Sequence, residues 1–90
     1  MIRVLIADHQ PIVNYGMRML FDNSNDIKIV STVNTAKQLI NYLKKGSVDL
    51  VMLSMDLPDM NGITVLRTVK KNFNNVRVII FTAPPENIYA

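Results

Sequence analysis

Three polar side chains stand at the ends of apolar runs, and their types could do chemistry: Asp8, Ser54 and Thr82. A carboxylate such as that of Asp8 is the oxygen ligand that a hard cation prefers. A serine hydroxyl becomes a nucleophile only beside a base, and the single histidine, His9, is the candidate base. Each residue alone is typical of a cap or a loop, but together they indicate one shared site.

The elements that must position these side chains are three apolar runs, which predict buried strands. The carboxyl ends of parallel strands meet at the same edge of a sheet, where ligands bind in open α/β folds. We therefore expect the three polar residues to line one crevice. The predicted strands are Ile2–Ala7, Val48–Ser54 and Val76–Phe81.

A helix and an edge strand are predicted between the first two of these runs. Pro11 suits the first turn of a helix, which continues to Phe21. Its side chains at Met17, Leu20 and Phe21 fall at helical spacing and are expected to pack in the core. A shorter run, Ile27–Val30, alternates apolar and polar residues and predicts a half-buried edge strand.

Two more helices are predicted farther along the chain. Asn34 or Thr35 would cap the second helix, and Gly46 follows it where a left-handed C-cap is expected. The third helix, Ile63–Phe73, comes after a turn at Pro58–Gly62. The apolar face of the second helix carries Ala36, Leu39, Ile40 and Leu43.

The order of the predicted elements is βαβαβαβ. The chain has 90 residues, which is enough for one small domain spanning residues 1–90. Helical patterns of about ten to fifteen residues between strands indicate right-handed crossovers and a parallel sheet. The fold class is therefore α/β, with helices on both faces of the sheet.

Composition limits the classes of function. The chain has no cysteine, which excludes a disulfide framework and a cysteine-based metal site. The net charge is +3, but the lysine pairs Lys44-Lys45 and Lys70-Lys71 fall at predicted helix ends rather than in one basic stripe. We therefore expect no direct binding of nucleic acid. With no apolar run of membrane-spanning length and an early acid at Asp8, we expect a cytoplasmic protein with no membrane contact.

Three stretches carry a family resemblance: Val4–Val13, then Val48–Leu53 with Pro58 and Asn61-Gly62, and finally Val78–Ala83. In these stretches the chain resembles the receiver domains of two-component response regulators, especially those with a LuxR-type DNA-binding output domain. The resemblance runs along the whole chain. It implies a flavodoxin/CheY-like parallel sheet with the strand order 2-1-3-4.

A working receiver, as the family implies, holds Mg²⁺ with an acidic pair after the first strand. Asp8 matches one acid of the pair, and His9 stands where the family usually has the second, ahead of Gln10-Pro11. Of the three carboxylates that the family implies for this crevice, the chain has one. We therefore expect Mg²⁺ binding to be lost or very weak, and no other cofactor.

The phosphoacceptor position of the family lies four residues before the turn proline, Pro58, and is occupied here by Ser54. Thr82 matches the hydroxyl that contacts the phosphoryl group, and the family's lysine belongs to a later strand. Without a base, the serine is not activated, and a loop histidine such as His9 is more often solvated. Asp56, an alternative acceptor, stands in the turn, where a solvated or capping carboxylate is expected. We predict a pseudo-receiver that is neither phosphorylated by phosphorelay nor an enzyme.

The resemblance also implies that the chain is truncated at its C-terminal end. Receivers continue for roughly thirty residues more, through one strand and two helices. The strand Val76–Phe81 would then be an edge, and one face of the sheet would lie bare. We expect a protein partner, either a second copy in a homodimer or a related response regulator. Three modes of association stay open: pairing of edge strands, exchange of the tail segment, and packing of helices on the bare face. The candidate interface residues are Val76, Val78, Ile80, Phe81 and Tyr89.

Three hypotheses of function follow from these observations. The first is a phosphorylation-independent interaction module that modulates a transcription regulator by homo- or heterodimerisation. The second is the N-terminal fragment of a DNA-binding response regulator whose output domain is absent. The third is a phosphoacceptor that uses Ser54 or Asp56. The fold alone does not choose among them, because this architecture hosts many functions.

Overall fold

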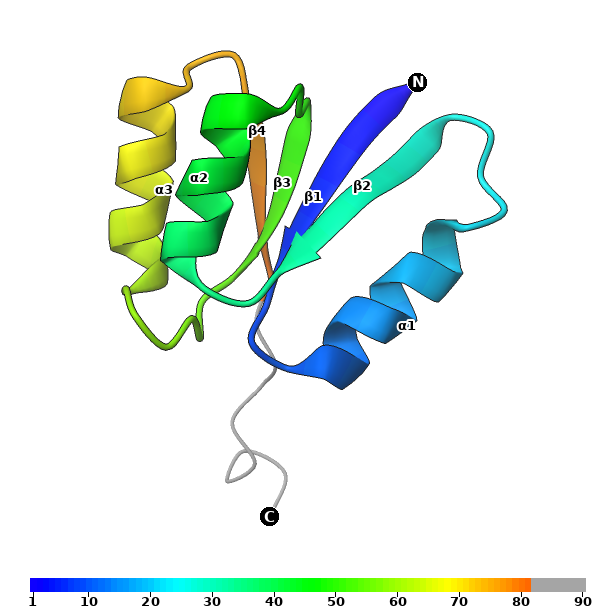
Figure 1. Cartoon of the computed structure of the whole chain (residues 1–90), viewed down its shortest axis with the longest axis horizontal. Coiled ribbons are helices and arrows are strands. Elements are labelled where there is room, and N and C mark those ends of the chain that lie inside the picture. The colour runs from blue at the N-terminus through cyan, green and yellow to red at the C-terminus, as the bar shows by residue number, and fades with distance from the viewer. Residues whose placement is uncertain (82–90) are drawn as a thin grey trace.

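Four parallel strands form one sheet that separates α1 from α2 and α3 (Figure 1). The computed structural model describes residues 1–81, apart from the side chains of residues 11–13, so the predictions at Thr82 and Tyr89 lie outside the described residues. The elements are β1 (Ile2–Ala7), α1 (Pro11–Phe21), β2 (Ile27–Val33), α2 (Ala36–Lys45), β3 (Leu50–Ser54), α3 (Gly62–Asn72) and β4 (Arg77–Phe81).

The strand order is β2-β1-β3-β4, as predicted. β1 and β3 lie side by side in the centre, with Ala7 opposite Leu53. β4 lies next to β3, with Phe81 opposite Ser54, and within residues 1–81 it has no other neighbour. The α/β fold class, the parallel sheet and the strand order 2-1-3-4 are therefore confirmed.

One side of the sheet, which we call the closed face, is covered by α2 and α3 (Figure 1). Alternate residues of the central strands point to this side, because successive side chains of a strand face opposite ways. These residues pack with the apolar stripes of the two helices into the main core. The fully buried members include Leu5, Ala7, Leu39, Val51, Leu53, Val65 and Val69.

The other side of the sheet carries only α1 among the described elements (Figure 1). Val4 and Ile6 of β1 are fully buried on this side, next to the half-buried Ile29 of β2. Farther along the sheet the cover ends, and Ile79 of β4 is 50% exposed. The prediction that Leu20 packs in the core was wrong, because this side chain is 75% exposed on a flank of α1.

Side-chain caps fix the start of two helices. The Thr35 hydroxyl accepts a hydrogen bond from the Gln38 amide at 3.1 Å, so Thr35 rather than Asn34 is the cap of α2. The Asn61 side chain accepts from the Ile63 amide at 2.7 Å and starts α3. Both helices end in lysine pairs, as predicted, where positive charge favours the helix dipole.

Gly46 does not form the left-handed C-cap that we predicted. Its φ is −110°, which is extended backbone, and its amide donates to the carbonyl of Tyr42 at 2.8 Å. A Cβ at this position would lie 2.9 Å from Cε1 of the Tyr42 ring. The close approach of that ring, and not a positive φ, accounts for the glycine.

β2 continues to Val33, three residues beyond the predicted end at Val30. The register with β1 shifts between Val4 and Leu5, so β2 contains one extra residue there. Ile29 lies opposite Val4, but Ser31 lies opposite Leu5. The bulge reverses which residues of β2 face the core. The simple alternation of apolar and polar residues along the sequence therefore ends after Val30.

Candidate functional site

Asp8 and Ser54 lie at the ends of adjacent strands, directly after the paired residues Ala7 and Leu53. Both are buried, with 4% and 3% of their surface exposed. The structure therefore brings these two predicted site residues to the same edge of the sheet. The third, Thr82, lies beyond the described residues.

Three neighbouring segments hold Asp8. Its carboxylate Oδ1 accepts a hydrogen bond from the Gln10 amide at 2.7 Å, and its own amide donates to the Val33 carbonyl at 3.0 Å. Its carbonyl accepts from Nδ2 of Asn14 at 3.0 Å. Asp8 is thus fixed by β2, by the loop that follows it and by α1.

Asn14 is a site residue that the sequence analysis missed. Its Nδ2 also lies 3.3 Å from Oδ1 of Asn34, so the side chain bridges the ends of β1 and β2. Its own Oδ1 is buried without a hydrogen-bond partner among the described residues. The available signal was a polar residue at a core position of a largely apolar helix.

The His9 side chain is 41% exposed and lies beside Asp8. Its Nδ1 lies 3.9 Å from Oδ1 of Asp8, which is too long for a hydrogen bond. Within the described part of the chain, no hydrogen bond joins His9 to Ser54. The described contacts therefore do not place His9 as a general base for the Ser54 hydroxyl.

Ser54 Oγ is engaged by the backbone of the loop that follows it. It accepts a hydrogen bond from the Asp56 amide at 3.1 Å and closes a tight turn. The Asp56 side chain is exposed in this turn, beyond the end of β3. Its position fits a solvated carboxylate, as the sequence analysis expected.

Asp59 connects the loop after β3 to the start of α2. Its two carboxylate oxygens accept hydrogen bonds from the Ala36 amide at 2.8 Å and the Lys37 amide at 3.0 Å. These two bonds, the one from Ala36 foremost, lower the pKa of Asp59 below its usual value of 3.8. No local pattern of residues indicates this link, because the two amides lie more than twenty positions away from Asp59.

The loop also passes close to the start of α3. A Cβ at Gly62 would lie 2.6 Å from Sδ and 2.9 Å from Cα of Met55. Only glycine fits this approach without a shift of the backbone. The loop is therefore tied at two points, Asp59 and Gly62.

Within residues 1–81, no group of three or more carboxylate, histidine or cysteine side chains is placed to hold a metal ion. A Mg²⁺ ion requires near-octahedral geometry, and a protein usually binds it through one or two carboxylates while it keeps several waters. The crevice offers the carboxylate of Asp8, with one oxygen already bonded to an amide, and the neutral Ser54 hydroxyl. His9 supplies a nitrogen, which is a poor ligand for so hard a cation.

The predicted interface residues of the last strand lie in different environments. Val76 is buried in the closed-face core, and Val78 packs against that core. Ile80 is exposed and Phe81 is half-buried, whereas Tyr89 lies outside the described residues. The most exposed apolar residue of the strand is Ile79, which the sequence analysis did not single out.

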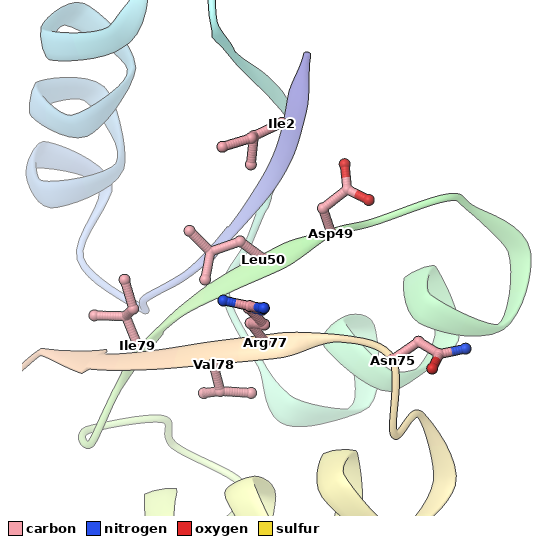
Figure 2. Close-up of a pocket in the computed structure, with 7 residues that line it drawn as sticks. All are labelled: Ile2, Asp49, Leu50, Asn75, Arg77, Val78 and Ile79. Atoms are coloured by element: carbon pink, nitrogen blue, oxygen red, sulfur yellow. The ribbon is translucent and has the colours of Figure 1, made fainter.

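At the amino ends of the strands, far from Asp8 and Ser54, lies a hollow of ≈ 620 Å³. Figure 2 shows Ile2, Leu50 and Ile79 pointing to the same side of the sheet, while Val78 points to the opposite side. Asp49 and Arg77 also line it. We call this surface, made of Ile2, Leu50, Ile79, Asp49 and Arg77, the open face.

Comparison with known proteins finds the same family along nearly the whole chain. The family model of the response regulator receiver domain matches residues 4–90. The chain is 31% identical over 87 residues to the Fimbriae Z protein of Salmonella typhimurium and 26% identical to response regulator UvrY of Escherichia coli. Each match covers 97% of this chain but only 41% and 40% of the relative.

Solved response regulators share the fold. RcsB of Salmonella typhimurium superposes with a TM-score of 0.88 at 27% identity, over 92% of this chain and 43% of that one. MaeR bound to beryllium trifluoride superposes with a TM-score of 0.85 at 28% identity, over 99% of this chain and 74% of that one. Among the helices of residues 1–81, none is long and apolar enough to cross a membrane.

Proposed function

This chain belongs to the family of response regulator receiver domains, and from that premise we propose that it acts in two-component signalling without accepting a phosphoryl group. Ser54 carries the proposal. It occupies the end of β3, where the family uses an aspartate, and its hydroxyl accepts from the Asp56 amide. A neutral hydroxyl without a base is a poor acceptor at this position.

The metal chemistry of the crevice supports the same proposal. Phosphotransfer to a receiver would need Mg²⁺ to neutralise the incoming charge, and the described donors offer a single carboxylate, Asp8. A solved relative, MaeR, binds the phosphoryl mimic beryllium trifluoride. We expect this chain to bind neither Mg²⁺ nor such a mimic at measurable strength.

A receiver that does no chemistry has to act by contact. Exposed apolar side chains on β4 and α1 support dimerisation with a second copy or with a related response regulator, which would modulate a transcription regulator. RcsB, a relative at 26% identity, forms dimers that bind DNA. We propose a cytoplasmic protein partner for this chain and no direct contact with nucleic acid.

The test is incubation of the chain with a small-molecule phosphodonor and Mg²⁺, followed by intact-mass measurement. We expect the mass to stay unchanged. The double variant His9→Asp, Ser54→Asp restores two carboxylates and is the matched control, expected to gain acid-labile phosphate. Stoichiometric phosphate on the parent chain would refute the proposal, and variants Ser54→Ala and Asp56→Asn would then locate the acceptor.

A second candidate function is the receiver part of a longer DNA-binding regulator. The chain spans about two fifths of the length of the curated relatives that it matches. An antibody against this chain would decide between the two on a blot from the native host. A band of the relatives' size favours the longer regulator, whereas a band at 10.2 kDa favours the separate module.

A further inference from the structure

The outer surface of α2 and α3 carries positive charge and no negative charge. Six of the chain's ten lysine and arginine residues lie in these two helices, and neither helix contains an acidic residue. The whole chain has a net charge of +3, so the rest of the molecule is net negative. Lys70 is tied back to the Val76 carbonyl at 3.3 Å. The other five side chains are exposed and lie in no hydrogen bond or ion pair within residues 1–81, and we call them the basic face: Lys37, Lys44, Lys45, Arg67 and Lys71.

The fold gathers charges that are far apart in the sequence. Each of the two helices leaves the carboxyl end of one parallel strand and returns to the amino end of another, so α2 and α3 run in the same direction (Figure 1). Both pack on the same core, and their lysine-rich last turns lie at the same end of the helix layer. The sequence analysis placed these lysine pairs at separate helix ends, but the parallel sheet brings those ends to one side of the molecule.

The helix dipole accounts for only part of this charge. It favours cations in a last turn, but Lys37 lies in the first turn of α2, where the dipole disfavours a cation. Arg67 lies in the middle of α3, four residues before Lys71, and like charges at this spacing repel each other. A helix surface that is only solvated usually mixes charges of both signs. The distribution therefore indicates a role beyond neutralising the helix ends.

The same surface contains a shallow hollow that is rich in hydrogen-bond donors. Its volume is ≈ 240 Å³, and it is lined by Gln38, Asn41, Tyr42 and Lys45, which follow one another on successive turns of α2. These side chains offer amide, phenol and ammonium donors. The Oε1 atom of Gln38 already accepts from the Asn34 amide at 2.8 Å, which leaves its NH₂ group as the free end. Such a hollow fits an ionised carboxylate, which only accepts hydrogen bonds.

We propose that the basic face docks an acidic segment of a protein partner, with one carboxylate seated in the hollow beside Lys45. The proposal names the chemistry of the partner in the proposed function and rests on that function. The two helices have 10 and 11 residues, so the face is about 15–17 Å long, which matches about five extended residues or three turns of a helix. Opposite charges across such a contact speed association and select the partner.

The shape and composition of the face favour a protein segment over nucleic acid or a membrane. Both helices lie flat against the sheet, so neither projects as an element that could enter a major groove (Figure 1). Neither helix has an exposed aromatic ring for base stacking, since Tyr42 is half-buried. Of the five cations, only Arg67 has the planar fork that pairs with phosphate through two bonds. Ile63 is the single large apolar residue exposed on these two helices, which leaves little apolar area to insert into a membrane.

The first measurement is the fluorescence anisotropy of a labelled peptide of consecutive glutamates, titrated with the full 90-residue chain at low ionic strength. We expect binding that weakens as salt is added, because exposed charges are screened. A peptide of the same length made of glutamines is the control and should not bind. Amide NMR shifts caused by the glutamate peptide should concentrate on α2 and α3.

Charge reversal locates the contact. The double variant Lys44→Glu, Lys71→Glu should weaken binding of the glutamate peptide roughly tenfold or more, because two attractive contacts become repulsive. The matched control is Arg18→Glu, Lys28→Glu, which changes the net charge equally at exposed positions outside the two helices and should weaken binding less than about threefold. Both double variants should keep their circular dichroism spectra. Equal weakening would indicate a general attraction to a basic chain and would overturn the proposal.

Asn41→Ala tests the hollow without changing the charge. It removes one amide from the lining and should weaken binding of the glutamate peptide about threefold. An unchanged affinity would overturn the placement of a carboxylate in the hollow.

Two further outcomes would overturn the whole proposal. One is the absence of binding at low ionic strength. The other is tighter binding to duplex DNA or to phosphatidylserine vesicles than to the glutamate peptide, because the face would then be a site for phosphate groups.

Failure here is distinguishable from failure of the proposed function. A chain that is inert to the phosphodonor and does not bind the glutamate peptide would refute the role of the basic face alone. A chain that binds the peptide and also takes up phosphate would refute the phosphorylation-independent function alone.

Discussion

On the closed face α2 and α3 bury Val51 and Leu53 completely, whereas on the open face the neighbouring strand residue Ile79 stays half exposed. The strands supply apolar side chains to both sides, so composition does not distinguish the two faces. The difference lies in how many helices cover each face. Apolar strand residues therefore predict that both faces of a sheet can be buried, and the number of helices on each face determines how far the residues are buried within the described part of the chain (Figure 1).

The largest effect is expected from truncating the covered core. Leu39→Ala removes a fully buried side chain beneath α2 and should cost roughly 2–5 kcal/mol of unfolding free energy, enough to threaten so small a domain. Leu20→Ala, the matched change on the exposed flank of α1, should alter monomer stability by less than about 0.5 kcal/mol. Urea denaturation of both variants at low protein concentration measures the contrast, and equal losses would contradict it.

Replacing each of two glycines with alanine should change the stability of the fold in opposite directions. Gly62→Ala forces a methyl group against Met55 and should destabilise the fold by roughly 1–3 kcal/mol. Gly16→Ala adds a methyl group in open space within α1 and should stabilise the monomer by roughly 0.5–1 kcal/mol. Thermal unfolding of the two variants measures both effects, and shifts of the same sign would contradict this contrast.

The hydrogen bonds that join Asp59, in the loop after β3, to the start of α2 should contribute less to the free energy of unfolding. Asp59→Ala removes two hydrogen bonds from the start of α2 and should cost about 1 kcal/mol. Because the pKa of Asp59 is lowered on folding, its contribution is complete above pH 3.8 and is lost as the pH falls through the folded value. Stability curves of the parent and Asp59→Ala should therefore converge below pH 3.8. Curves that stay apart in acid would assign the loss to packing.

Ser54→Ala should have the smallest effect. It removes one hydrogen bond to the Asp56 amide and should cost about 0.5 kcal/mol. Neither the dimer nor the response to a phosphodonor should change. If this variant sedimented differently from the parent chain, a change in the crevice would be affecting association through the open face. The arrangement of residues 1–81 does not suggest such an effect.

Much of the fold could be predicted because strand and helix signals agreed along the chain. β1 matches its predicted bounds, and the strand order followed from the family resemblance. Local pattern failed where an added residue reversed the facing of side chains, as after Val30 in β2. It also failed at Leu20, because helical spacing predicts a face of α1 but not how far the cover extends.

The candidate site was only partly predictable. The positions of Asp8 and Ser54 followed from their place at the ends of buried strands. Asn14 and Asp59 were missed because their bonds join segments that are distant in sequence. Such contacts depend on how α1, β2 and α2 pack, which no short window of residues encodes.

The bulge in β2 has a consequence for how this protein could aggregate. Open-ended fibrils require two usable strand edges on every molecule, so that each added chain presents a fresh edge to the next. β2 is interrupted by its extra residue, which makes it a poor template for another strand, and only β4 remains regular among the described strands. Within residues 1–81, addition of strands would therefore stop once two β4 edges have met, because no second regular edge is left among these strands to propagate a fibre.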